Sequence, residues 1–534
     1  MKKRILSIGL ILTLTLGLIG CSLNEAGKGA SEADDLPRNV IDDNYRTTYE
    51  VFVYSFCDSN GDRIGDLPGL TGKLDYISDL GFNAIWLMPI MPSPSYHKYD
   101  VTDYKDIDPD YGTLEDFSAL IEACHEKGID VYIDFVMNHT SSEHPWFKEA
   151  VKYLQTLEGE ELVIDEAACP YAGYYNFTTE KKDGFEPVPG CGNKFYYECR
   201  FWGGMPDVNL DNEKVQQEFK DIAAFWYDLG VDGFRMDAVT SYYTEDMGAS
   251  VDALKWFADY VHGLNPELYI VTEAWTGADT YDKYLASGID STFEFEFSQA
   301  EGYIAKALNT GKASTFAKHL APSVEGLRQY NAAAIPAPFY TNHDTARTGG
   351  YYTGENALAK EKMGWAMSLT MTGNSFLYYG EELGMRGSGD DENKRQAFLW
   401  SVDQSAEGMA TALKATKKLD NTGKDLPTQQ ADENSVYNFI KKVTMLRNSS
   451  PVITHGSYKW LEDISTDSCC VIEKEYEGEK LYLLYNVGSE AAEIDLSQKA
   501  PEAKLYFACT TDENEATLVE GKVPVPGYSL VVIE

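Results

Sequence analysis

The feature that most constrains the fold is a series of eight strand-like apolar runs, separated by stretches with helical periodicity. The runs are Tyr49–Phe56, Asn83–Ile90, Val131–Asn138, Asp232–Val239, Tyr269–Trp275, Thr292–Phe297, Ala337–Thr341 and Ser375–Tyr379. Between them, residues 113–127 and 212–229 carry capping residues and helical spacing, as βα units require. Eight such units predict an α/β fold, a (β/α)8 TIM barrel over residues 44–139 and 211–449, with its active site at the carboxyl ends of the strands.

Two segments depart from this alternation. Residues 140–210 separate the third run from the next helix, and a connection of that length predicts an inserted domain. From residue 450 the pattern changes to short alternating strands without helices between them, such as Lys480–Asn486 and Tyr528–Ile533. Residues 450–534 are therefore predicted to form a C-terminal antiparallel β-sandwich.

Several runs end in polar residues that a buried parallel strand has no structural use for. Arg235 and Asp237 lie two residues apart in an extended segment, so they face the same side and can meet. An Arg beside a carboxylate keeps that carboxylate ionised, as a carboxylate nucleophile requires. A purely structural ion pair would explain this segment equally well. Three more runs, however, end with Asp134, Glu273 and Asp344.

The order of these residues resembles the four signature regions of the α-amylase family of retaining glycoside hydrolases. The matching residues are Asp134, Asn138–His139, Gly233-x-Arg235-x-Asp237, Glu273 and Asn342-His343-Asp344. Met205–Asn209 resembles the fifth region of the family and lies ahead of the Arg-x-Asp segment, as in the family. The resemblance extends from about Tyr49 to Glu534 and is strongest to the oligo-1,6-glucosidase and neopullulanase-like branch. It implies that residues 140–210 are the family's domain B and residues 450–534 its domain C.

The resemblance also implies a role for each matching residue. Asp237 is expected to be the nucleophile, Glu273 the general acid/base, and Asp344 a catalytic group that binds sugar hydroxyls and steadies the transition state. Glu273 must hold a proton near neutral pH while Asp237 stays ionised. The residues expected to bind substrate are Tyr99, Asp100, His139, Arg235 and His343. For the two histidines, the alternative is a satisfied core position.

Departures from the family pattern bear on specificity. Oligosaccharide exo-glucosidases of the family usually carry Asp where this chain has Tyr96, which favours internal cleavage of longer chains. Ala238, after the expected nucleophile, favours α-1,4 bonds. The family's frequent Lys-His pair is replaced by Thr240 and Ser241, so the product pattern stays open. Lys98 replaces the usual Gly before the Tyr-Asp pair, with an effect that the sequence does not define.

A loop after the first run predicts a calcium site. Asp58, Asn60, Asp62, Ile64 and Asp66 place oxygen ligands at alternate positions, as a loop that wraps Ca²⁺ does. It is not an EF-hand, since Arg63 occupies the position where that loop needs Gly. The loop resembles a calcium loop of the same branch of the family; the alternative is a solvated acidic turn.

The N-terminus has the features of an export signal. Lys2, Lys3 and Arg4 precede the apolar run Ile5–Ile19, which ends in a sequence that resembles a bacterial lipobox, Leu18–Cys21. Residues 1–20 are therefore predicted to be a lipoprotein signal peptide and Cys21 the lipidated mature N-terminus. Residues 21–43 are predicted to be a flexible tether. The protein is expected to be extracytoplasmic and anchored to the bacterial cell membrane; the alternative is a plain signal peptide with an incidental Cys.

Composition restricts the partners. The chain has 85 acidic and 45 basic residues, a formal charge of −40, which argues against a nucleic-acid partner. The expected partners are an α-glucan or maltooligosaccharide substrate and, through Cys21, a membrane, and we expect a monomer. Eight cysteines besides Cys21 remain, and the cluster Cys169, Cys191 and Cys199 is compatible with a disulfide whose pairing the spacing does not determine.

Together these features predict a lipid-anchored α-amylase-type hydrolase that cleaves α-1,4 bonds in starch or maltodextrins through a covalent glycosyl-Asp intermediate. Two alternatives stay open. In a 4-α-glucanotransferase, a sugar hydroxyl would replace water at the same carboxylates. A non-catalytic glucan-binding lipoprotein would belong to a different class, and the intact Asp237, Glu273 and Asp344 argue against it.

Overall fold

The computed structural model describes residues 36–37, 39–244, 246–410, 413–416, 424–511 and 516–534. Its centre is a parallel sheet of seven strands in the order β10-β1-β2-β3-β7-β8-β9. The strands are β1 (Thr47–Val51), β2 (Ala84–Leu87), β3 (Asp130–Phe135), β7 (Gly233–Met236), β8 (Tyr269–Thr272), β9 (Ser291–Thr292) and β10 (Ser375–Tyr378). Phe293 forms a parallel bridge to Ala337, and Phe339 forms one to Phe376. These bridges bring the predicted run Ala337–Thr341 between β9 and β10 and close the barrel.

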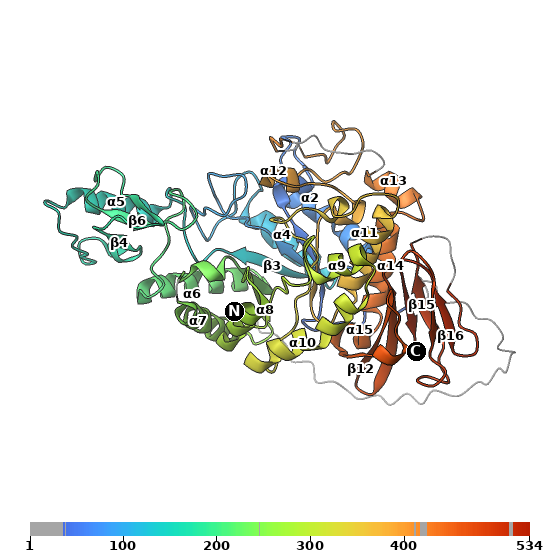
Figure 1. Ribbon diagram of the computed structural model, residues 1–534. Coiled ribbons are helices and arrows are strands. Elements are labelled where there is room, and N and C mark those ends of the chain that lie inside the picture. Colours follow the sequence, from blue (N-terminus) through green and yellow to red (C-terminus); the bar gives the residue numbers. More distant parts are fainter. Residues whose placement is uncertain (1–35, 38, 245, 411–412, 417–423, 512–515) are drawn as a thin grey trace, which may run out of the picture.

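The first predicted run is shorter than expected, because β1 ends at Val51 and a short helix, α1 (Val53–Phe56), follows it. Longer helices surround the strands (Figure 1). They are α3 (Leu74–Asp79), α4 (Leu114–Glu126), α6 (Glu213–Asp228), α7 (Met247–Leu264), α9 (Tyr303–Thr310), α10 (Ser314–Tyr330), α11 (Ala357–Leu369) and α14 (Val436–Asn448). Shorter ones are α2 (Leu67–Thr71), α8 (Ala278–Tyr281), α12 (Asp391–Lys394), α13 (Leu426–Ala431) and α15 (Pro451–His455).

Two of these helices begin as the sequence predicts. Thr113 accepts a hydrogen bond from the amide of Asp116, whose side chain accepts one from the Thr113 amide, a reciprocal cap at the start of α4. The Asn212 side chain accepts a hydrogen bond from the amide of Lys214 at the start of α6. Because Thr113 and Asn212 are the caps, each helix begins one residue after the predicted start; each also ends one residue before the predicted end.

The long connection after β3 folds into a small unit of its own, which projects from one end of the molecule (Figure 1). It contains α5 (Pro145–Thr156) and a three-stranded antiparallel sheet in the order β4-β6-β5. The strands are β4 (Phe177–Thr178), β5 (Phe185–Pro187) and β6 (Tyr196–Glu198). A bridge from His139 to Asp207 joins the unit to the carboxyl end of β3, and a bridge from Tyr175 to Val208 lies within the unit.

The C-terminal part is antiparallel throughout. Its five-stranded sheet has the order β11-β12-β13-β17-β15, and β14 pairs with β16 in a second sheet. The strands are β11 (Ser457–Trp460), β12 (Cys469–Tyr476), β13 (Glu479–Asn486), β14 (Ala492–Asp495), β15 (Leu505–Cys509), β16 (Lys522–Val525) and β17 (Ser529–Ile533).

The two faces of the larger sheet pack against different partners. Along β12, Cys470 and Ile472 join the apolar core of the barrel, whereas Cys469 and Val471 join a second core together with residues of β14 and β16. This follows from the two-residue period of a strand. The C-terminal sheet is therefore one layer shared by two cores.

The predicted signal peptide and the lipidation residue Cys21 lie outside the described residues. Of the predicted tether, Leu36 and Ile41 are buried, and the Val40 amide donates a hydrogen bond to the Asn448 carbonyl. The folded part of the protein thus begins before residue 44. In the described part of the chain no helix is long and apolar enough to cross a membrane, and all eight cysteines there are free and buried.

Candidate active site

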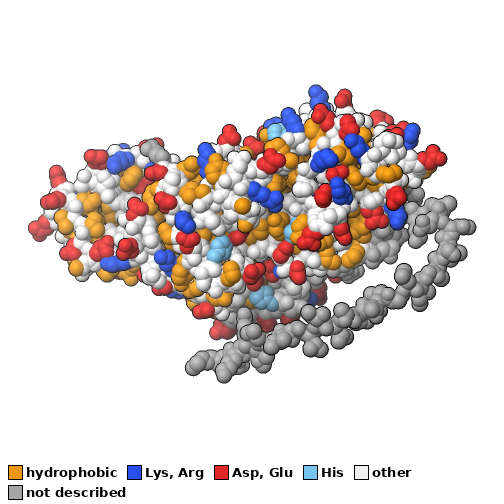
Figure 2. Space-filling view, turned by 90° about the horizontal axis from the view of Figure 1, so that it is seen from below, with side chains coloured by type: hydrophobic (Ala, Val, Ile, Leu, Met, Phe, Trp, Pro, Cys, Tyr) orange, Lys and Arg blue, Asp and Glu red, His pale blue; other side chains and the backbone are white. Residues whose placement is uncertain are grey.

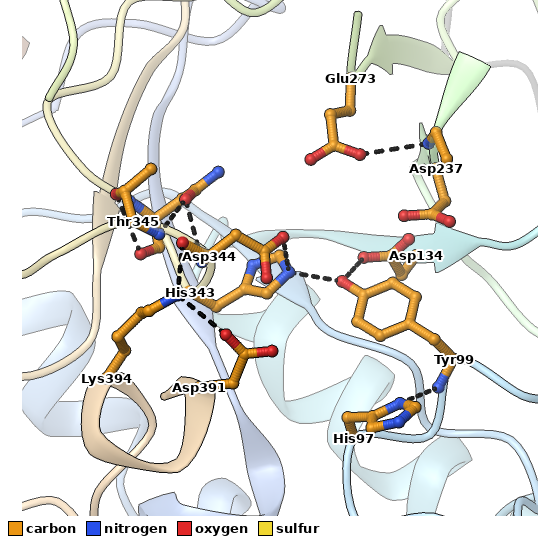
Figure 3. A network of polar contacts seen from close by, with 12 residues as sticks. His97, Tyr99, Asp134, Asp237, Glu273, His343, Asp344, Thr345, Asp391 and Lys394 are labelled. Carbon is orange, nitrogen blue, oxygen red and sulfur yellow. Dashed lines mark hydrogen bonds and ion pairs between the residues drawn. The ribbon is translucent and has the colours of Figure 1, made fainter. Parts of the chain in front are cut away.

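The polar residues singled out in the sequence meet at the carboxyl end of the barrel. Asp134 lies on β3 and Arg235 on β7, while Asp237 and Glu273 follow directly after β7 and β8. Asp344 follows the segment that bridges β9 and β10. Figure 3 shows Asp134, Asp237, Glu273 and Asp344 arranged around one space. This is the end of the barrel at which the eight-unit pattern predicts the site.

One buried guanidinium links three of these carboxylates. Arg235 Nη1 lies 2.6 Å from Asp237 Oδ1 and 2.8 Å from Asp134 Oδ1, and its Nη2 lies 3.0 Å from Glu273 Oε1. The side chain of Arg235 is fully buried, and its guanidinium lies over the rings of Trp86 and Tyr99. The pairing of Arg235 with Asp237 was predicted from their spacing, whereas its contacts with the other two carboxylates depend on neighbouring strands.

Glu273 is held in its protonated form up to neutral pH. Burial raises its pKa to about 7; the charge of Arg235 opposes this shift, and the charges of Asp237 and Asp344 add to it. Its Oε2 accepts a hydrogen bond of 3.2 Å from the amide of Ala238. Ala238 has a left-handed backbone, with φ +47, in the turn that follows Asp237. Glu273 can therefore donate a proton next to a carboxylate that is fixed by an Arg.

The environment of Asp344 lowers its pKa, in contrast to that of Glu273. Its carboxylate lies 3.0 Å from His343 Nε2 and 2.6 Å from Arg395 Nη2. Burial alone would raise the pKa of Asp344, but the charges of His343 and Arg395 outweigh it and lower the pKa well below the usual range. Asp344 is thus an anion at the working pH of any such enzyme.

His343 is held in its charged form by two carboxylates. Its Nδ1 lies 2.5 Å from Oε1 of Glu50 on β1. Burial lowers the pKa of this imidazole, yet Asp344 and Glu50 together raise it to about 9.

Sequence reasoning missed two site residues, Glu50 and Arg395. Glu50 is a buried carboxylate within an apolar strand run, the same signal that marked Asp134, so it could have been found. Arg395 lies in an irregular segment far along the chain, and its contact with Asp344 comes only from tertiary packing.

Among the predicted substrate-binding residues, Tyr99 and His139 offer side-chain atoms to the site, whereas Asp100 bonds within a loop. Tyr99 reaches the site, because its hydroxyl lies 3.0 Å from Asp134 Oδ2 and 2.8 Å from His343 Nε2, and its ring stacks on that of His343. His139 is buried, its Nε2 has no hydrogen-bond partner among the described residues, and burial lowers its pKa. Asp100 instead accepts hydrogen bonds from the Ser93 and Ser95 hydroxyls and so organises the loop that carries Tyr99.

The predicted calcium loop is closed by its own amides. Asp58 accepts hydrogen bonds from the amides of Asn60, Gly61 and Arg63, and Asp66 accepts them from Ser59 and Gly69. The oxygen donors of the loop suit a hard cation in their chemistry. In the described part of the chain, however, no group of three or more His, Cys, Asp or Glu side chains is arranged to hold a metal ion. The calcium site therefore stays a prediction.

Comparisons with known proteins agree with this geometry. The family model described as "Alpha amylase, catalytic domain" matches residues 50–456. The chain is 36% identical over 488 residues to Alpha-amylase 3 of Dictyoglomus thermophilum, covering 91% of this chain and 92% of that protein. It is 27% identical to a 4-alpha-glucanotransferase of Thermotoga neapolitana, covering 86% and 96%. The solved structure of Eubacterium rectale Amy13B superposes with a TM-score of 0.92 at 46% identity, covering 95% of this chain and 99% of that one.

Proposed function

The chain belongs to the α-amylase family of glycoside hydrolases, and from that premise we propose that it cleaves α-1,4-glucosidic bonds within starch-derived glucans, with retention at the anomeric carbon. The observation that carries this proposal is the shared Arg235, which holds Asp237 and Glu273 side by side while burial raises the pKa of Glu273 to about 7. A nucleophile and a proton donor are thereby available at the same pH.

The reaction proceeds in two displacements. Asp237 attacks the anomeric carbon as the glycosidic C–O bond breaks, and the proton of Glu273 passes to the departing oxygen. Water then attacks the glycosyl-Asp237 ester, gives its proton to Glu273 and releases Asp237. Retaining enzymes need the two carboxyl groups about 5–5.5 Å apart, and their common contact with one guanidinium supports such a spacing.

The remaining groups bind and polarise the sugar. Asp344, held anionic by His343 and Arg395, accepts hydrogen bonds from sugar hydroxyls and stabilises positive charge at the reacting ring. The Tyr99 ring supplies a flat apolar face for that ring. The unpartnered Nε2 of His139 is a polar atom left for the substrate.

A test with maltoheptaose separates the candidate functions. The protein from Asn39 onward and its Asp237→Asn variant are incubated with the substrate, and the products are followed over time. Shorter maltooligosaccharides alone, absent in the variant, support hydrolysis. Products both longer and shorter than the substrate would indicate the glucanotransferase, which the Thermotoga relative favours as second candidate. Binding without any product would leave the glucan-binding lipoprotein.

We further propose that Cys21 carries the lipid anchor and that the enzyme acts outside the bacterial cytoplasm. Support comes from the signal-like sequence and from the position of the segment that precedes β1. Arg46 pairs with Asp130 at the start of β3, and the Thr47 amide bonds Asn83 before β2, so this segment lies at the end of the barrel opposite the site. When the full-length protein and Cys21→Ala are produced in bacteria fed labelled palmitate, the label is expected on the first and not on the second; absence of label from both would contradict the anchor.

We also propose that the loop Asp58–Asp66 binds Ca²⁺ and that the ion serves stability rather than catalysis. The five predicted donors lie in one loop, which Arg63 fastens by hydrogen bonds to the carbonyls of residues 404, 405, 406 and 409. Chelation is expected to lower the melting temperature, since an ion at about 100 times its Kd adds about 2.7 kcal/mol. Asp62→Asn should melt alike with and without chelator. An unchanged wild-type melt on chelation would contradict the site.

A further inference from the structure

Lys98, directly before Tyr99, has an unusual backbone and an unusual environment for a lysine. Its φ is +65, in the left-handed region that side chains other than Gly seldom adopt. It is also buried, with 3% of its surface exposed. Both features are costly unless the surroundings hold them in place.

Two carboxylates supply that compensation. Lys98 Nζ lies 2.8 Å from Asp108 Oδ2 and 3.2 Å from Asp110 Oδ2, and the ammonium lies over the ring of Tyr111. Asp108 Oδ2 also accepts a hydrogen bond from the amide of Ser93, at the start of the loop that carries Tyr99. The ammonium therefore ties this loop to the segment 108–111.

The next residue along the chain reaches the catalytic centre. The Tyr99 hydroxyl contacts Asp134 and His343, and its ring stacks on the His343 ring at a centroid distance of 5.6 Å. Figure 3 shows this hydroxyl between the two residues. Lys98 thus contacts Asp108 and Asp110, whereas the next residue, Tyr99, contacts the catalytic site. The left-handed backbone at Lys98 directs these two neighbouring side chains to their different partners.

We propose that Lys98 is a positioning residue, whose buried ion pairs with Asp108 and Asp110 hold the strained turn that presents Tyr99 to the substrate. The inference rests on the proposed function in one respect, because Tyr99 matters to turnover only if it contacts the sugar. Its structural part, the dependence of the Tyr99 position on the Lys98 ion pairs, does not require turnover.

The test uses three substitutions at one position. Lys98→Met keeps most of the side-chain length and removes the charge, Lys98→Gly removes the charge and relieves the backbone strain, and Lys98→Arg keeps the charge. On maltoheptaose, Lys98→Met is expected to lower kcat/KM at least about tenfold and Lys98→Arg to recover part of the loss. Lys98→Gly is expected to lose less than Lys98→Met, because Gly adopts the left-handed turn without strain although the ion pairs are gone. Lys98→Gly covers the case in which the Met variant does not fold.

Whether Lys98 acts through Tyr99 is tested by comparing the effect of Lys98→Met on kcat/KM in the wild-type protein and in a Tyr99→Ala variant. In a Tyr99→Ala background, adding Lys98→Met is expected to change kcat/KM little, because the group that Lys98 positions is already absent. An equal loss in both backgrounds would overturn the proposal. The matched control is Lys362→Met on α11, another buried lysine, whose Nζ bonds the Asn434 carbonyl; it should lower the melting temperature without changing kcat/KM.

Crystal structures of the Lys98→Met and Lys362→Met proteins give a readout that is independent of activity. The Tyr99–His343 contact should be lost in the first and kept in the second. A Tyr99 hydroxyl that stays in place without Lys98 would overturn the proposal. An inactive wild-type protein would refute the proposed function while leaving this structural result readable.

Discussion

At the scale of single residues, the site depends on charges that are few in number and mutually compensated. Arg235 contacts three carboxyl groups in a buried space and so reduces the repulsion between those that are ionised. His343 and Arg395 compensate the charge of Asp344. Burial raises the pKa of both Glu273 and Asp134 to about 7, so the protonation of these two groups changes within the working range.

The pH dependence of kcat/KM should therefore include the titration of Glu273, and the Glu273→Gln variant separates it from that of Asp134. The raised pKa of Glu273 means that the protonated, donating form is present below about 7 and is lost as the pH rises through that value, so activity should fall on the alkaline side. Glu273→Gln should lose about 10²–10⁴-fold on maltoheptaose. On α-maltosyl fluoride the loss should be much smaller, because fluoride departs without a proton. Equal losses on both substrates would rule out the proton-donor role.

At the scale of elements, a buried cation ties α14 to the backbone of neighbouring segments of the barrel. Arg447 on α14 donates hydrogen bonds to the carbonyls of Leu369, Met371, Gly373 and Arg46 and to the Thr47 hydroxyl. The guanidinium therefore satisfies acceptors from the end of α11, the segment before β10 and the entry to β1.

Arg447→Met should accordingly destabilise the protein by about 3–5 kcal/mol, because it leaves several buried carbonyls without donors. Lys442→Met, at an exposed position on the same helix, should change stability by no more than about 0.5 kcal/mol. Melting temperatures of the two variants measure the difference. If both variants melted alike, the hydrogen bonds of Arg447 would contribute nothing to the stability of the barrel.

At the scale of the whole molecule, the acidic composition has two consequences. Acidic side chains are spread over the surface among interspersed basic ones, as the face in Figure 2 shows. Others are buried, and burial raises their pKa: to about 6 for Asp130, about 8 for Glu294, and about 7 for Asp207, Asp282, Glu361 and Glu382. These groups keep their protons in the folded chain at pH values where the unfolded chain has lost them.

Stability should therefore fall as the pH rises. The contribution of these carboxyl groups is fully present below their unfolded values near 4 and is lost as the pH passes through about 6 to 8. His343 acts in the same direction up to about 9. The melting temperature should be higher at pH 5.5 than at pH 8, and the difference should shrink in Glu294→Gln, whose carboxyl oxygens have no hydrogen-bond partner among the described residues. An equal melting temperature at both pH values would contradict this account.

The sequence by itself determined the architecture and the positions of most of the site. Eight apolar runs alternating with capped helices admit few arrangements other than a barrel, and the carboxylates at the ends of those runs had to meet at one end of it. The Arg235–Asp237 contact followed from the two-residue period of a strand. These properties are local, so they can be read from neighbouring residues.

Only the tertiary structure decided which charges face each other. Glu50 meets His343 and Arg395 meets Asp344 across large sequence separations, and Lys98 is paired with Asp108 and Asp110 by the path of a loop. The pKa of Glu273 likewise depends on burial and on four charged groups from other strands and loops. Spacing along the chain does not encode such contacts, because they arise when packing brings distant segments within a few ångströms and removes the water that would otherwise screen them.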